Sequence, residues 1–221
     1  MSGCWSRSCA NDTQMRLLFA AQPGINPMPL PQSNSRRALR HTRAITVQVF
    51  ARDDGLWDLD AHIADTKTRD TKLASGIRPA GEPVHDLHLR VTIDTQMTIV
   101  AAEAVSDAVP YPGFCDTIGP AYGKLVGLNL SQGFRKGLTD RLGGIEGCTH
   151  LTELGQALPT AAFQAFAGEV FITHDDGAGD DGSARKPFEL DHCHALRADG
   201  AAVAKYYPRW FLTPAKQQQS S

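Results

Sequence analysis

Two stretches of alternating apolar and polar residues constrain the fold of this chain more than any other feature. The first covers residues 46–63 around the turn sequence RDDG, and the second covers residues 86–107 around DTQM. Side chains two residues apart on a strand face the same side of a sheet. Each stretch therefore predicts a hairpin with one apolar face, and together they predict four antiparallel strands.

The apolar spacing lengthens to three or four residues after Pro110 and Pro112, which is typical of amphipathic helices. It predicts helices over 115–125, 134–142 and 149–158, with a further helical stretch over 160–167 after Pro159. Strands followed by helices indicate an α+β fold. We expect an antiparallel sheet of two hairpins with three to four helices packed on one face, and a last short hairpin within 188–210.

The composition predicts one folded domain with irregular ends. The sequence QPGINPMPLPQSNSRR near the start is too polar and proline-rich to bury much apolar area, so we expect residues 1–38 to be a disordered N-terminal extension. Residues 39–213 then form a single α+β domain, and residues 214–221 a disordered tail. The segment HDDGAGDDGSAR, 174–185, is interpreted as a mobile acidic loop, because it lacks the ligand pattern of an EF-hand.

Charge and hydropathy exclude some classes of partner. Residues 1–43 hold six basic residues and one acidic residue, which leaves 16 basic and 23 acidic residues in 44–221. Such an acidic surface disfavours nucleic acid. No apolar run is long enough for a membrane helix. Five cysteines in no even framework suit a reducing compartment, so we expect a cytoplasmic protein with free thiols.

Several motifs resemble an uncharacterised bacterial family, the domain of unknown function 2889. They are RDDGLWDLDAHIADTK, PAGEPVHDLHLRVTID, PYPGFC, LGGIEGCTHLTEL and HCHALRADG, in this order over about residues 39–211. The resemblance implies an association with the bacterial breakdown of plant-derived aromatic compounds, including lyase steps on lignin-type dimers.

The order of elements in 82–167 is also similar to that of iron–sulfur cluster scaffold proteins. That similarity implies cluster ligands at Cys115 and Cys148. The family's first ligand cysteine has no counterpart, because GEPVHD stands in its place. The histidine also follows Cys148 instead of preceding it, so a three-cysteine site is not expected.

Cys148 and His150 are the first candidate site residues, because they lie where a helix should begin. The helix dipole would favour the Cys148 thiolate, and His150 could share its pocket. Zinc would need three or four ligands, with Cys115 and His85 as available partners. Alternatively, Cys148 and His150 are ordinary core residues.

Three other regions supply candidates. His85 shares a strand face with Leu87 and so points toward the helices, although a buried structural imidazole is nearly as good an interpretation. Tyr111, between two prolines, could bind a phenolic oxygen or act in proton transfer, with Asp107 close by in sequence. Ordinary packing at a strand-to-helix corner is an equally good interpretation of Tyr111.

Arg52, Trp57 and Lys67 could bind an anionic aromatic ligand. A charged turn with a core tryptophan is the plainer interpretation of these three residues. His192 and His194 have metal-ligand spacing but no second ligand cluster nearby in sequence.

The leading hypothesis is a cofactor-independent lyase that acts by acid–base elimination on a small aromatic substrate. His150 or His85 would be the base, and Tyr111 would position the phenolic oxygen. Arg52 or Lys67 would balance the developing charge. The alternative is a scaffold or carrier that binds zinc or an iron–sulfur cluster through Cys115, Cys148 and His150. Either reading leaves homodimerisation open.

Overall fold

The computed structural model describes residues 30–31, 33–171, 173 and 186–213. The expected acidic loop and C-terminal tail, and most of the expected N-terminal extension, lie outside these residues. The chain divides into two units, residues 1–38 and residues 39–221, and every helix and strand named below belongs to the second. The domain boundaries drawn from the sequence stay predictions.

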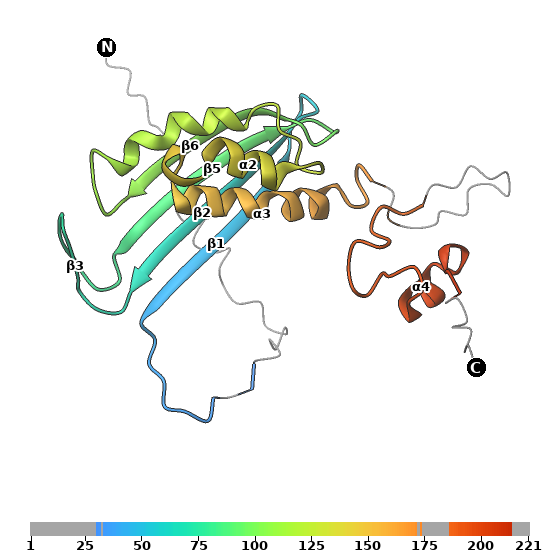
Figure 1. The fold of residues 1–221 in the computed structure, drawn as a ribbon, viewed down its shortest axis with the longest axis horizontal. Helices are drawn as coiled ribbons and strands as arrows, with labels where there is room; N and C mark the ends of the chain where they lie inside the picture. The colour runs from blue at the N-terminus through green and yellow to red at the C-terminus, as the bar shows by residue number, and fades with distance from the viewer. Residues whose placement is uncertain (1–29, 32, 172, 174–185, 214–221) are drawn as a thin grey trace, which may run out of the picture. The chain divides into compact units, whose positions relative to one another are not determined.

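A four-stranded antiparallel sheet forms the centre of the fold (Figure 1). Its strand order is β1-β2-β5-β6. The strands are β1 (His41–Ala51), β2 (Trp57–Lys67), β5 (Pro83–Ile93) and β6 (Ile99–Ala108). Both predicted hairpins, β1-β2 and β5-β6, are confirmed. The connection between them carries a small ribbon, β3 (Thr71–Leu73) and β4 (Gly76–Arg78), that the sequence analysis did not predict.

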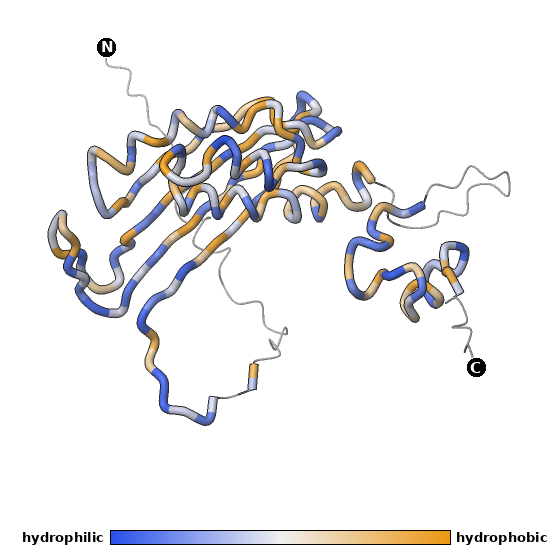
Figure 2. The backbone as a smooth tube through the Cα atoms, in the orientation of Figure 1, coloured by the Kyte–Doolittle hydropathy of each residue, from blue (hydrophilic) through white to orange (hydrophobic). Residues whose placement is uncertain are grey.

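The alternation along the strands divides the sheet into an apolar face and a polar face, and the tube in Figure 2 changes colour accordingly along the strands. Leu59 and Ile63 of β2 and Val91 of β5 are fully buried on the face toward the helices. Asp60, His62 and Arg90 point to the other face, which we call the open face. Burial of the apolar side chains fixes the strand register, because a slip of one residue would expose all of them.

Helical segments cover the apolar face of the sheet (Figure 1). They are η1 (Cys115–Leu125), α2 (Phe134–Leu142), η2 (Gly144–Glu146) and α3 (Thr149–Phe166). η1 is a 3₁₀ helix with Pro120 inside it. The α+β class and the packing of helices on one face are thus as predicted.

The predicted break at Pro159 is wrong, because α3 continues through it. Proline in a helix removes one backbone hydrogen bond. A continuous buried stripe runs past this position, however, and Leu158, Ala162 and Phe166 all pack in the core. Packing of the whole stripe holds the two halves in one helix.

The predicted C-terminal hairpin is also wrong. Turns lead from residue 188 to the helix α4 (Ala201–Tyr206), which is followed by the short 3₁₀ helix η3 (Pro208–Trp210). The segment AAVAKY is rich in alanine, the strongest helix former, and it follows Gly200 directly. Local helix propensity explains the outcome.

Candidate active site

A buried carboxylate near the end of β2 is the centre of the candidate site. Asp65 continues the helix-facing row of Leu59, Ala61 and Ile63 and is only 3% exposed. Arg43 of β1 binds it with two hydrogen bonds, from Nε to Oδ1 and from Nη2 to Oδ2, both 2.8 Å long. The Nε2 atom of His41 lies 2.8 Å from Oδ1. A buried carboxylate with this many partners is held in a single orientation.

Two further histidines reach the same carboxylate. His85 lies opposite Asp65 in the β2-β5 register, next to a bulge between Asp65 and Thr66. Its Nδ1 is 3.2 Å from Asp65 Oδ2, and Nε2 of His150 is 3.6 Å from the same oxygen. The two imidazole rings stack with their centroids 3.7 Å apart. The structure therefore brings together the two histidines that the sequence analysis selected as candidate bases.

The start of α3 is fixed by a buried tyrosine from η1. The backbone N–H of Cys148 donates to Tyr122 Oη at 3.1 Å, and this hydroxyl lies 2.9 Å from both the Cys148 carbonyl oxygen and Thr152 Oγ1. Burial raises the pKa of Tyr122, so its hydroxyl stays protonated. These bonds hold the first turn of α3, and with it His150, against the sheet.

The surroundings shift the pKa of each central group. Burial alone would raise the pKa of Asp65, but hydrogen bonds from Arg43 and His41 outweigh it and lower the pKa to about 2. The pKa of His85 is lowered by burial and then by the charge of His150, and that of His150 by burial and then by the charge of Arg43. The site thus combines a permanent anion with two imidazoles that favour the neutral form, which accepts protons.

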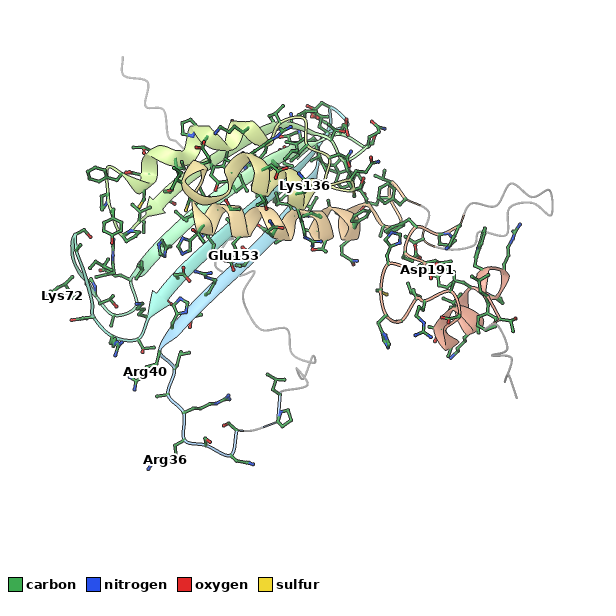
Figure 3. All side chains as sticks on the ribbon, in the orientation of Figure 1. Arg36, Arg40, Lys72, Lys136, Glu153 and Asp191 are labelled. Carbon is green, nitrogen blue, oxygen red and sulfur yellow. The ribbon has the colours of Figure 1, made fainter. Side chains whose placement is uncertain are left out.

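Arg43 links the sheet to α3 by a second ion pair. Its Nη1 donates to Glu153 at 2.5 Å, and Figure 3 labels this glutamate on α3. Glu153 follows His150 by three residues, about one helical turn. Arg43 is therefore a bridge between both carboxylates, with its side chain 32% exposed at the border of the site.

Cys148 lies beside the site but contributes no close contact to the carboxylate. Its Sγ is 3.9 Å from His150 Nδ1. Lys67 ends β2 two residues after Asp65 and is opposite His41 in the register. Tyr111 follows β6 at the end of the sheet where β5 begins, and it is 49% exposed. These three residues border the same end of the sheet.

The other predicted substrate-binding residues lie elsewhere. Arg52 and Trp57 are at the opposite end of the β1-β2 hairpin from Asp65. Arg52 is paired with Asp54 and Asp58, and Trp57 packs on Phe166 with ring centroids 4.9 Å apart. Asp107 points to the open face, where it lies near His88. These three side chains do not join the group around Asp65.

The predicted ligand set of Cys115, Cys148 and His150 is not assembled. Among the described residues, two groups place metal-ligating atoms within 4.8 Å of one another, and neither contains a cysteine. One is Asp65 with His85 and His150, and the other is His62 with Asp86 and His88. Cys115 instead packs against the hydrophobic core as η1 begins. His192 and His194 are exposed and belong to neither group.

Sequence reasoning missed His41, Arg43 and Asp65. A signal was present, because all three continue the odd-numbered rows that contain Val47 and Val49 in β1 and Leu59 to Ile63 in β2. Charged residues in phase with an apolar strand face are expected to be buried in pairs. A surface hollow lined by Lys124, Asp140 and Arg141, among others, contains none of the site residues.

The described residues thus form an α+β fold in which a stacked histidine pair lies beside a buried carboxylate. The chain belongs to the family described as Protein of unknown function (DUF2889), which matches residues 41–164. The match begins at His41 and includes every residue of the group around Asp65. No curated protein and no solved structure matches the chain. Within the described residues, none of the helices has the length and apolar character to cross a membrane.

Proposed function

We propose that this protein is a cofactor-independent lyase that acts by acid–base elimination on a small aromatic compound. The observation that carries the proposal is the His85–His150 pair, stacked at 3.7 Å and turned toward the buried carboxylate of Asp65. A general base works best when its neutral form is present at the working pH and a nearby anion stabilises its protonated form. Both conditions apply to these imidazoles.

One imidazole removes a proton from the substrate in the proposed step. If the proton comes from a hydroxymethyl group, the carbon–carbon bond breaks, formaldehyde leaves, and the electron pair stays on the substrate carbon. The imidazolium then returns this proton to that carbon. Asp65 stabilises the imidazolium by charge and orients its ring. Tyr111, at the same end of the sheet, is proposed to contact the phenolic oxygen.

Of the two residues proposed to balance the developing charge, Lys67 lies at the Asp65 end of the sheet and Arg52 at the opposite end. Arg43 has a different role. It is the arginine bonded to Asp65, and its guanidinium keeps this carboxylate ionised. The aromatic substrate class rests on the resemblance of the sequence motifs to a family associated with breakdown of plant-derived phenolics. The metal-scaffold alternative is weaker, because Cys115 lies outside the group that contains His150.

The proposal is tested with a panel of lignin-type phenolic dimers and aromatic acids, incubated with protein that has been treated with a chelator. Product and released formaldehyde are measured. We expect turnover by the native chain and a decrease of about 10²- to 10⁴-fold in kcat for His150→Ala or His85→Ala, the usual range for losing a general base. His194→Ala, which changes an exposed histidine, is the matched control. Full turnover in both site variants would remove the acid–base assignment.

A further inference from the structure

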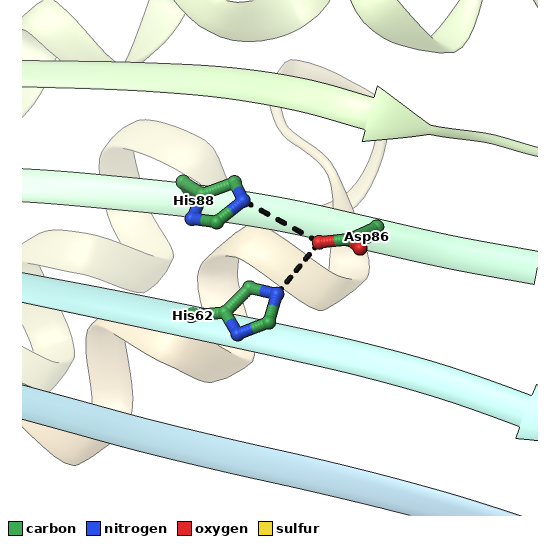
Figure 4. A group of neighbouring side chains, drawn as sticks. All are labelled: His62, Asp86 and His88. Atoms are coloured by element: carbon green, nitrogen blue, oxygen red, sulfur yellow. Dashed lines mark hydrogen bonds and ion pairs between the residues drawn. The ribbon is translucent and has the colours of Figure 1, made fainter. Parts of the chain in front are cut away.

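A second histidine cluster lies on the open face of the sheet. His62 of β2 and His88 of β5 are directly opposite each other in the register, and their rings stack at 4.3 Å with an interplanar angle of 11°. Asp86 lies two residues before His88 on the same strand face. Figure 4 shows both imidazoles turned toward the Asp86 carboxylate, with the helices behind the sheet. The proposed lyase chemistry uses none of these residues.

Two of the distances between the donor atoms are close to those that a small metal ion requires. Asp86 Oδ1 is 2.6 Å from His62 Nε2 and 3.4 Å from His88 Nε2. Asp107 of β6 brings Oδ2 to 3.2 Å from His88 Nε2. Tetrahedral ligands at about 2.1 Å from Zn²⁺ lie about 3.4 Å from one another. The 3.4 Å and 3.2 Å distances match this spacing, whereas the 2.6 Å hydrogen bond between His62 and Asp86 would lengthen around an ion.

The local charge favours a cation here more than at Asp65. The Asp65 oxygen that faces His85 and His150 already accepts a hydrogen bond from Arg43 at 2.8 Å, so a metal ion there would meet a guanidinium. Asp86 instead faces two imidazoles, with a hydrogen bond to His62 and a 3.4 Å contact to His88. Arg90, the next residue along this face of β5, has its guanidinium bound by Asp60 through two 2.6 Å hydrogen bonds.

The cluster is also accessible. The side chains of His62, Asp86 and His88 are 35%, 27% and 41% exposed, and that of Asp107 is 70% exposed. An ion could enter without any opening of the fold. Two imidazoles beside carboxylates suit zinc and similar transition metals, whereas calcium and magnesium prefer oxygen ligands alone.

We propose that His62, Asp86 and His88, with Asp107 as a further ligand, form a binding site for a divalent transition metal ion such as Zn²⁺. The ion ties β2, β5 and β6 together on the face of the sheet opposite the candidate active site. Binding lowers the free energy of the folded state alone, because the unfolded chain does not hold these ligands together.

The test is a calorimetric titration of the untagged full chain with Zn²⁺, after the thiols have been blocked with iodoacetamide to exclude cysteine sites. We expect one ion per chain and a midpoint of thermal unfolding that rises with zinc. His62→Asn and His88→Asn are expected to weaken binding about tenfold or more and to reduce the zinc-dependent shift. Asp86→Asn keeps nearly the same side-chain shape but removes the charge, so it tests whether the carboxylate is needed for zinc binding.

His85→Asn is the matched variant on the opposite face, and it should leave zinc affinity unchanged. Circular dichroism of each zinc-free variant shows whether it is folded. Asp107→Asn tests whether the most exposed of the proposed ligands contributes to zinc binding. The proposal is overturned if the native chain does not bind zinc at one ion per chain. It is also overturned if folded His62→Asn and His88→Asn bind as tightly as the native chain, or if His85→Asn alone abolishes binding.

Discussion

The carboxylate of Asp65 determines how the residues around it behave. It is buried, yet it remains charged, because Arg43 and His41 donate to it. Its negative charge in turn stabilises the protonated form of His85 or His150 during a proton transfer. Asp65, His85 and His150 come from β2, β5 and α3, so the site exists only when the sheet and the helix are packed together.

The lowered pKa values of His85 and His150 predict a pH dependence of stability. Both values lie below the ordinary 6.5, so the unfolded chain takes up protons first as pH falls. The free energy of unfolding should therefore fall as pH drops below about 6.5 and level off below the folded-state pKa values. Urea unfolding at about pH 7.5 and about pH 5.5 measures this change.

The matched variant for this prediction is His85→Asn combined with His150→Gln. It keeps the other histidines, so its loss of stability between the two pH values should be smaller than that of the native chain. An equal loss in both proteins would mean that the pair does not titrate as its burial requires.

The pKa of Asp65 predicts a second decrease in the free energy of unfolding, at lower pH. Its pKa of about 2 lies below the ordinary 3.8, so its contribution is complete above about pH 4 and is lost as pH falls toward 2. The shift corresponds to about 2 kcal/mol for this buried group. Asp65→Asn should remove that decrease from the acid unfolding profile, and an unchanged profile would contradict the assignment.

The sequence predicted part of the site and missed the rest for a physical reason. Alternation gave the direction of His85, and the helix start gave the place of His150. Neither pattern shows which strand lies beside which, so the convergence of both histidines on Asp65 was not predicted. The β1-β2-β5 order and the packing of α3 on these strands create it.

At the scale of elements, local patterns predicted the segments that carry strong periodicity. The strands of the two hairpins and α2 are examples, because burial of one face determines them. The prediction was wrong at Pro159, where long-range packing overrides a local helix breaker, and in 188–210, where the sequence lacks strict alternation. Local signals are reliable only where tertiary packing agrees with them.

The contact between η1 and β6 gives a prediction about a single glycine. A Cβ atom at Gly119 would lie 2.4 Å from the carbonyl oxygen of Ala104, a backbone atom that cannot move aside easily. Gly119→Ala should therefore destabilise the protein by about 1–3 kcal/mol. Chemical unfolding measures the change.

Gly123 is the control within the same 3₁₀ helix, because a Cβ there meets no atom within 4 Å. Gly123→Ala should change the unfolding free energy by less than about 1 kcal/mol. If the two variants were equally stable, η1 would not pack as closely on β6 as the structure has it. Because η1 carries Tyr122, a shift at Gly119 should also loosen the start of α3.

At the scale of the whole molecule, one sheet separates two histidine centres of different character. The helix-covered face holds His85 and His150 with a permanent ion pair, and the open face holds His62 and His88 with exposed carboxylates. His85 and Asp86 are neighbours on β5, and Asp65 and His62 both lie on β2, since successive residues of a strand point to opposite faces. Strands β2 and β5 therefore connect the proposed chemistry to the proposed metal site.

The start of β1 gives the last prediction, which concerns the extent of the folded unit. Thr68 bonds to the Leu39 and Arg40 carbonyl oxygens, so residue 39 is already joined to the sheet. Removal of residues 1–38 should change the free energy of unfolding by less than about 1 kcal/mol, as for other changes that leave the packed core intact. Removal of residues 1–44 also deletes His41 and Arg43 and leaves the Asp65 charge buried without its guanidinium. Loss of the guanidinium should lower the free energy of unfolding by about 3 kcal/mol or more. Urea unfolding of the two shortened chains compares them directly, and equal stability would show that the β1 end does not hold Asp65 in place.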